Sequence, residues 1–150
     1  ISSMDFDIIH REKTNLDEKI TQSSELTLNY DGSKTRIKFE LAKGNEIDES
    51  DFLYIPETNF LFYRGMIEWS AFDLTNKCVV RNESATQLPF IERRNNVILI
   101  YDDLYAESTD LKAGRIDNVP IDPPTESVDY DDRIEFDSPV FGKQILKLSK

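Results

Sequence analysis

The single histidine and the single cysteine are the first residues of this sequence that could perform acid–base or nucleophilic chemistry. His10 ends a short alternating segment and precedes Arg11, so we expect it at the surface or at a strand end. Cys78 lies between Lys77 and Val79 in an apolar segment, so we expect it in the core, where no neighbouring base would generate a thiolate. No serine occupies a Gly-x-Ser-x-Gly turn. The sequence therefore names no catalytic residue, and we expect a protein that is not an enzyme.

The sequence also lacks the residues that usually bind metals and cofactors. One histidine and one cysteine cannot form a structural zinc site. Asp102–Asp103 and Asp129–Asp132 offer the carboxylate oxygens that calcium prefers, but neither has the spacing of an EF-hand loop. The five glycines are scattered and form no phosphate-binding loop. We therefore expect no metal and no cofactor.

Negative charge is the strongest feature of the composition. The 150 residues include 29 acidic and 18 basic side chains, which gives a formal net charge of -11 and a pI of about 4.5. Residues 99–137 hold 12 acidic and three basic side chains, so most of the excess lies in one quarter of the chain. A protein that binds a nucleic-acid backbone normally carries a basic stripe. The charge therefore excludes that class and indicates a basic protein partner.

The acidic quarter of the chain supplies the candidate binding residues. Tyrosines are interleaved with its carboxylates, and tyrosine is common at binding hot spots. Acids on loops can also serve only to keep a protein in solution, and this alternative stays open. The predicted partner-binding residues are Asp102, Asp103, Tyr105, Glu107, Asp117, Asp122, Glu126, Asp129, Tyr130, Asp131 and Asp132.

The pair Arg93–Arg94 is the one compact cationic feature. With Asn95 it falls between two predicted strands, which indicates a turn. The turn is either a contact for an acidic patch on a partner or a solvated hairpin tip.

Apolar and polar residues alternate with a period of two, which indicates β-strands. Met4, Phe6 and Ile8 predict a first strand. Residues 25–30 and 36–41 flank a glycine-containing turn and predict a hairpin. Denser apolar segments predict strands buried on both faces. They are residues 52–55, 60–63, 66–74 and 78–81, and residues 89–92 and 96–101 predict a further pair of strands.

The remaining segments complete a mainly β prediction. Residues 102–108 favour one or two helical turns, and the three prolines within residues 117–132 favour an acidic surface loop. Residues 134–146 predict a strand that returns to the sheet. Residues 60–81 resemble one β-propeller blade, but a complete propeller needs more than 150 residues. No internal repeat is evident. We predict a single domain over residues 1–150, formed by an antiparallel sheet, a sandwich or a half-open barrel with at most two short helices.

The ends of the chain bear on its compartment. No segment approaches the roughly 18–20 apolar residues of a membrane span, and residues 1–4 lack the pattern of an intact secretory signal. We interpret residues 1–3 as a remnant that precedes a natural start at Met4, although a signal removed from a longer precursor would also leave such an end. The single cysteine fits a reducing compartment. The sequence thus predicts a cytoplasmic protein without a membrane partner.

A small, acidic chain without catalytic motifs, starting at Met4, resembles the immunity proteins of bacterial polymorphic or contact-dependent toxin systems. The acidic aromatic segment Tyr101–Tyr105 and the Asp129–Asp132 segment carry this resemblance. It implies that the partner is a cognate toxin domain, often a nuclease, whose active cleft is covered by the bound protein. The alternative is an extracytoplasmic β-domain that binds a ligand or forms a surface module, which the aromatic-rich β pattern also fits.

Overall fold

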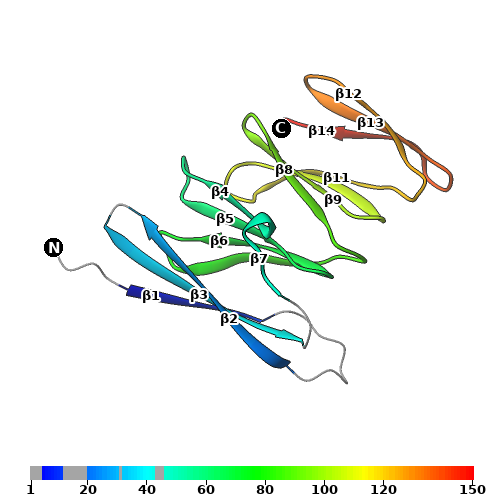
Figure 1. The fold of residues 1–150 in the computed structure, drawn as a ribbon. Helices are drawn as coiled ribbons and strands as arrows, with labels where there is room; N and C mark the ends of the chain where they lie inside the picture. The colour runs from blue at the N-terminus through cyan, green and yellow to red at the C-terminus, as the bar shows by residue number, and fades with distance from the viewer. Residues whose placement is uncertain (1–4, 12–19, 31, 43–45) are drawn as a thin grey trace.

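The computed structural model describes residues 5–11, 20–30, 32–42 and 46–150. The described residues form four β-sheets, here named A to D, which follow one another from the N-terminal to the C-terminal end (Figure 1). The prediction of a mainly β protein is confirmed. The expectations about residues 1–3 and Met4 lie outside the described residues.

Sheet A contains β1 (Asp5–Arg11), β2 (Ile20–Tyr30) and β3 (Ser33–Ala42), with β3 in the centre. The antiparallel pairing of β2 with β3 confirms the predicted hairpin, whose turn includes Gly32 at a φ of 75°. The strand β1 is also confirmed, but it pairs with β3 in parallel. Sheet A is therefore mixed rather than purely antiparallel.

Sheet B is a four-stranded antiparallel meander preceded by the 3-10 helix η1 (Glu49–Asp51). Its strands are β4 (Phe52–Ile55), β5 (Phe60–Arg64), β6 (Glu68–Asp73) and β7 (Cys78–Ser84). The two central strands, β5 and β6, are buried on both faces, as their continuous apolar residues predicted. The edge strands β4 and β7 are more exposed, which corrects the burial on both faces expected for residues 52–55 and 78–81.

Sheet C repeats this meander with β8 (Phe90–Arg94), β9 (Val97–Tyr101), β10 (Tyr105–Thr109) and β11 (Arg115–Pro120). Its central strands, β9 and β10, are again the buried ones. Sheets B and C are therefore inner layers that need apolar side chains on two faces.

Sheet D has three antiparallel strands, β12 (Glu126–Asp129), β13 (Arg133–Ser138) and β14 (Gly142–Lys147). Gly142 closes the β13–β14 turn at a φ of 63°, a left-handed conformation that glycine adopts without steric cost. The side chains of β12 are exposed along its whole length. Sheet D thus covers sheet C with one face and leaves the other to solvent.

The alternation along each strand sends side chains into the cores between adjacent layers. Phe39 from sheet A meets Tyr63 and Phe72 from sheet B in the first core. Phe62 and Trp69 point from the opposite face of sheet B toward Ile98 of sheet C. The third core lies between sheets C and D and contains Leu99, Ala106, Val119, Ile134, Phe136 and Leu146. Successive layers are thus joined by burial of apolar surface.

A structural repeat links sheets B, C and D, although the sequence shows none. In each sheet a backbone N–H donates to the carbonyl three residues later and closes the turn between two strands. The N···O pairs are Gly65–Glu68 at 2.7 Å, Asp102–Tyr105 at 2.9 Å and Tyr130–Arg133 at 2.9 Å. The three units are β5–β7, β9–β11 and β12–β14. In each unit the backbone N–H of the residue after the last strand donates to a carbonyl in this turn: Ala85 to Ile67, Ile121 to Leu104 and Leu148 to Asp132. The repeat therefore lies in the backbone and not in the side chains.

Three expectations about individual segments are wrong. Residues 102–108 form a turn and β10 rather than helical turns, because Ala106 and Ser108 fit the buried faces of a central strand. Half of residues 117–132 belongs to β11 and β12, so the segment is not one continuous loop. Cys78 is exposed because β7 is an edge strand of sheet B. Among the described residues, no helix has the length and apolar character needed to span a membrane.

Candidate functional site

Asp102 is buried and holds two loops together, so it is not part of an exposed acidic surface as predicted. Its Oδ2 accepts a hydrogen bond from the backbone N–H of Thr86 at 2.9 Å, and its Oδ1 accepts one from the Thr86 hydroxyl at 2.5 Å. The N–H of Asp103 also donates to Asp102, at 2.7 Å. These bonds join the segment between β7 and β8 to the β9–β10 turn. Asp102 is therefore a positioning residue within the chain.

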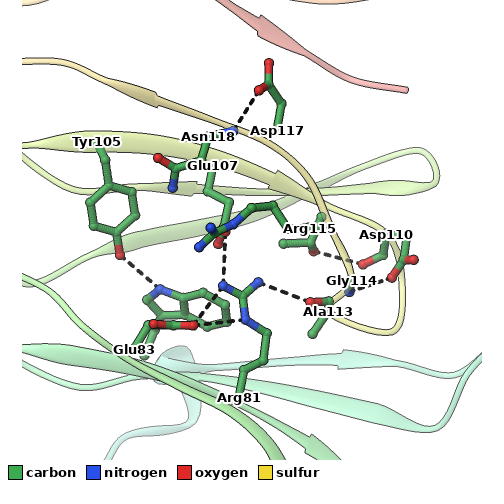
Figure 2. Close-up of polar contacts among 12 residues, drawn as sticks. Arg81, Glu83, Tyr105, Glu107, Asp110, Ala113, Gly114, Arg115, Asp117 and Asn118 are labelled. Atoms are coloured by element: carbon green, nitrogen blue, oxygen red, sulfur yellow. Dashed lines mark hydrogen bonds and ion pairs between the residues drawn. The ribbon is translucent and has the colours of Figure 1, made fainter. Parts of the chain in front are cut away.

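Glu107 is also buried, with 1% of its surface exposed, between two arginines. Arg81 Nη2 lies 3.0 Å from Glu107 Oε1, and Arg115 Nε forms an ion pair with the same oxygen (Figure 2). Arg81 also pairs with Glu83 at 3.0 Å and donates to the carbonyl of Ala113 at 3.1 Å. Glu107 is therefore not exposed as predicted, and its charge is paired between sheets B and C.

Tyr105 belongs to the same interlayer network. Its hydroxyl accepts a hydrogen bond from the indole N–H of Trp69 at 3.0 Å (Figure 2), and the Arg81 guanidinium lies 4.7 Å from the centroid of that indole. Burial raises the pKa of Tyr105 above its ordinary value. Tyr105 is thus a half-buried support between sheets rather than an exposed contact residue.

Asp117 and Asp122 accept hydrogen bonds from backbone N–H groups of sheet D. Asp117 Oδ2 accepts from Lys147 at 2.9 Å, and Asp122 Oδ1 accepts from Val140 at 3.1 Å. Both residues are half-buried. They fix sheet D on sheet C, and their remaining surface faces solvent.

The other predicted residues lie on the surface of sheets C and D. Asp103 is exposed in the β9–β10 turn. The others follow one another along β12 and the turn after it: Glu126, Asp129, Tyr130, Asp131 and Asp132. We call this set the β12 acidic segment. It is the only part of the predicted surface that the described structure keeps together and exposed.

Two carboxylates of the β12 acidic segment have cationic neighbours. Asp129 lies 3.3 Å from Arg94, and Asp132 lies 2.9 Å from Arg133, whose guanidinium is also 4.0 Å from the Tyr130 ring centroid. Glu126 and Asp131 have no ion pair among the described residues. The segment therefore keeps an excess of negative charge. Arg93 and Arg94 themselves belong to β8 rather than to a turn, which corrects the prediction.

A histidine, a serine and a glutamate meet between sheets A and B in a combination that hydrolases use. His10 Nε2 lies 3.1 Å from Glu68 Oε1 and 3.3 Å from Ser70 Oγ. Asn82 donates to Glu68 at 3.1 Å and to Ser70 at 2.8 Å. His10, Glu68 and Ser70 are buried, which corrects the surface position expected for His10. Because the rings of Phe39, Tyr63 and Phe72 surround the His10 ring, this network lies within the packed contact between sheets A and B.

Sequence reasoning missed a surface hollow beside the margins of sheets B and C. One part, of about 230 Å³, is lined by Asp51, Phe52, Arg64 and Phe90. A neighbouring part, of about 130 Å³, shares Asp51 and Arg64 with it. Its other lining residues include Glu46, Met66 and Leu88. We call the two parts together the β4–β8 groove. Its residues come from three separate segments, 46–53, 62–66 and 88–91, so no local pattern in the sequence could have indicated it.

The chain has to be interpreted from its own residues, since no protein-family model, curated protein or solved structure matches it. Within the described residues, no group of three or more histidine, cysteine or acidic side chains is arranged to hold a metal ion. The candidate surfaces are therefore the β12 acidic segment and the β4–β8 groove.

Proposed function

We propose that this protein is a non-enzymatic binding protein that neutralises a basic protein partner, in the manner of an immunity protein that covers the active cleft of a cognate bacterial toxin. The observation that carries the proposal is the β12 acidic segment, because all of its side chains are exposed. Opposite charges accelerate the encounter of two proteins and disfavour wrong partners. A basic cleft that binds phosphates is a suitable counterpart for such a surface.

The fold supports the same proposal. The strand β12 pairs with β13 on one side and forms an edge of sheet D. Edge strands and the turns beside them can present side chains to a partner without any change in the core. The buried carboxylates Asp102 and Glu107 are engaged within the chain, so binding does not need them directly.

The decisive experiment is a growth assay in bacteria. The protein is co-expressed with the C-terminal domain encoded by the neighbouring reading frame, where a toxin is expected. We expect the protein to restore growth and the double variant Glu126→Gln/Asp131→Asn to restore it less. The association rate of the purified pair should fall several-fold with this variant and should decrease steeply as salt rises.

A matched control removes two exposed charges elsewhere. Glu25 in sheet A and Glu57 beside β5 are both exposed, and the variant Glu25→Gln/Glu57→Gln has the same net charge as the test variant, although Glu57, unlike the tested residues, pairs with Arg93 at 2.7 Å. It should restore growth like the natural protein. Equal loss of rescue in both variants would show that only total charge matters and would contradict the assignment of the surface. Absence of rescue by the natural protein would contradict the proposed function itself.

A further inference from the structure

We propose that the β4–β8 groove is a second docking site, which receives a partner segment in which a lysine or arginine lies next to large apolar side chains. This inference rests on the proposed function only in that the partner is basic. The groove is separate from the β12 acidic segment and differs from it in chemistry. It combines exposed apolar side chains with carboxylates.

The apolar part of the groove consists of side chains that a monomer would be expected to bury. Met66 is 55% exposed, Leu88 is 54% exposed and Phe90 is 49% exposed. All three line the groove, although they come from the β5–β6 turn, the β7–β8 segment and β8. Contiguous exposed apolar surface of this kind marks interaction sites.

The loops that carry these side chains are held by hydrogen bonds. The N–H of Ala85 donates to the carbonyl of Ile67 at 2.6 Å, which links the β7–β8 segment to the turn that bears Met66. Asp102 fixes the same segment through Thr86. Phe90 stacks on Tyr101 with ring centroids 6.0 Å apart. The apolar surface is therefore organised before a partner arrives, which lowers the entropic cost of binding.

The charges beside the groove determine the partner's chemistry. Glu46 and Asp51 line the groove, and Asp48 and Glu49 lie within three residues of Asp51 in the chain. Arg64 is the cation that lines the groove, and its Nε lies 3.4 Å from Asp51 Oδ1. The excess of carboxylates attracts a cationic side chain, while Met66 and Phe90 line the same groove and offer apolar contacts. A membrane surface carries anionic lipids and would be repelled by the same carboxylates.

The probe is a random ten-residue peptide library displayed on phage and selected on the purified full chain. We expect the selected peptides to place a lysine or arginine within two positions of leucine, isoleucine, methionine or an aromatic residue. Synthetic copies should bind Met66→Ser and Leu88→Ser at least tenfold more weakly than the natural protein. The variant Ile145→Ser changes a residue of similar exposure on the outer face of sheet D, and its affinity should stay within twofold.

The remaining outcomes each overturn the inference. No enrichment, or peptides that bind the Leu88→Ser variant as well as the natural protein, would show that the groove is not a docking site. Purely cationic peptides whose binding depends on Glu126 and Asp131 would support the β12 acidic segment alone. Binding to phosphatidylglycerol vesicles that is lost in Leu88→Ser would identify a lipid occupant. Conversely, if the expected peptides are selected but the growth assay fails, the inference about the groove is supported and the immunity function is contradicted.

Discussion

At the scale of single residues, the most consequential feature is that two acids of the expected surface are engaged inside the protein. Glu107 is held between Arg81 and Arg115. A buried carboxylate costs several kcal/mol unless a cation and hydrogen bonds compensate it. Sequence reasoning could not anticipate this, because Arg81 is 26 residues away and meets Glu107 only when sheet C packs on sheet B.

The pair formed by Arg81 and Glu107 should therefore show strong coupling. Arg81→Met should lower the free energy of unfolding by about 3 kcal/mol, because it leaves Glu107 buried beside the more exposed Arg115 alone. Glu107→Leu should lower the free energy of unfolding by a similar amount. The double variant should be less destabilised than the sum of the two, since an apolar pair leaves no uncompensated charge. Urea unfolding of the four proteins tests this, and additive losses would contradict it.

Tyr101 should produce a distinct pH dependence. Burial, followed by the negative charge of Glu92, raises the pKa of Tyr101 to about 12, whereas an unfolded tyrosine titrates near 10. Tyr101 therefore stays protonated to higher pH in the folded state. Its contribution to stability should be constant below pH 10 and be lost between pH 10 and pH 12.

The absorbance of tyrosinate at 295 nm should show a late titration step that Tyr101→Phe removes. The same variant should unfold with a weaker dependence on pH between 10 and 12. A step that persists in Tyr101→Phe would mean that another tyrosine titrates late. That tyrosine would be Tyr105, whose pKa is also raised by burial.

At the scale of elements, the β6–β7 and β10–β11 turns share the same kind of side-chain hydrogen bond, although the strands beside them differ in sequence. Asp73 accepts hydrogen bonds from the N–H groups of Thr75 and Asn76, both at 3.0 Å, in the β6–β7 turn. Asp110 does the same for Lys112 at 2.9 Å and Gly114 at 2.8 Å in the β10–β11 turn. Each aspartate is followed by leucine, a pair that the β13–β14 turn of sheet D lacks.

Gly114 should tolerate no side chain while Asp110 is present. A Cβ atom at Gly114 would lie 2.6 Å from Asp110 Oδ2, so Gly114→Ala must displace the carboxylate that closes the turn. We expect the free energy of unfolding to fall by about 1–3 kcal/mol, the usual cost of disrupting a hydrogen bond to a charged group. In an Asp110→Ala background the same change should cost almost nothing. Thermal or urea unfolding measures both, and an equal cost in the two backgrounds would refute the steric explanation.

Strand prediction succeeded where the pattern within one segment decides the structure. The hairpin of β2 and β3 and the buried strands β5 and β9 follow directly from alternation or from continuous apolar residues. The failures have a common cause, which is that burial depends on a distant neighbour. Cys78 is exposed because β7 is an edge strand, and His10 is buried because Glu68, 58 residues away, pairs with it. Of the candidate surface, only the β12 acidic segment could be found from sequence.

At the scale of the whole molecule, the structure is a series of layers in which each sheet packs on its immediate neighbours. Sheets B and C have two apolar interfaces each, whereas sheets A and D have one each in the described residues. In repeat proteins with this arrangement, stability is approximately the sum of the stability of each unit and the interfaces between neighbours. The binding surfaces proposed above occupy different layers, so a change in one should leave the other folded.

The layered arrangement predicts unequal responses to two large-to-small substitutions in buried positions. Phe62 lies in the core between sheets B and C, and Leu146 lies in the core between sheets C and D. Each change to alanine should cost about 2–5 kcal/mol. Leu146→Ala weakens the only described interface of sheet D, so the amides of sheet D should exchange faster while those of β5 and β6 keep their protection. Phe62→Ala weakens an inner interface and should accelerate exchange in both sheets B and C. Native-state hydrogen exchange resolved by residue distinguishes these patterns, and uniform acceleration in all four sheets with Leu146→Ala would mean that the layers unfold as one unit.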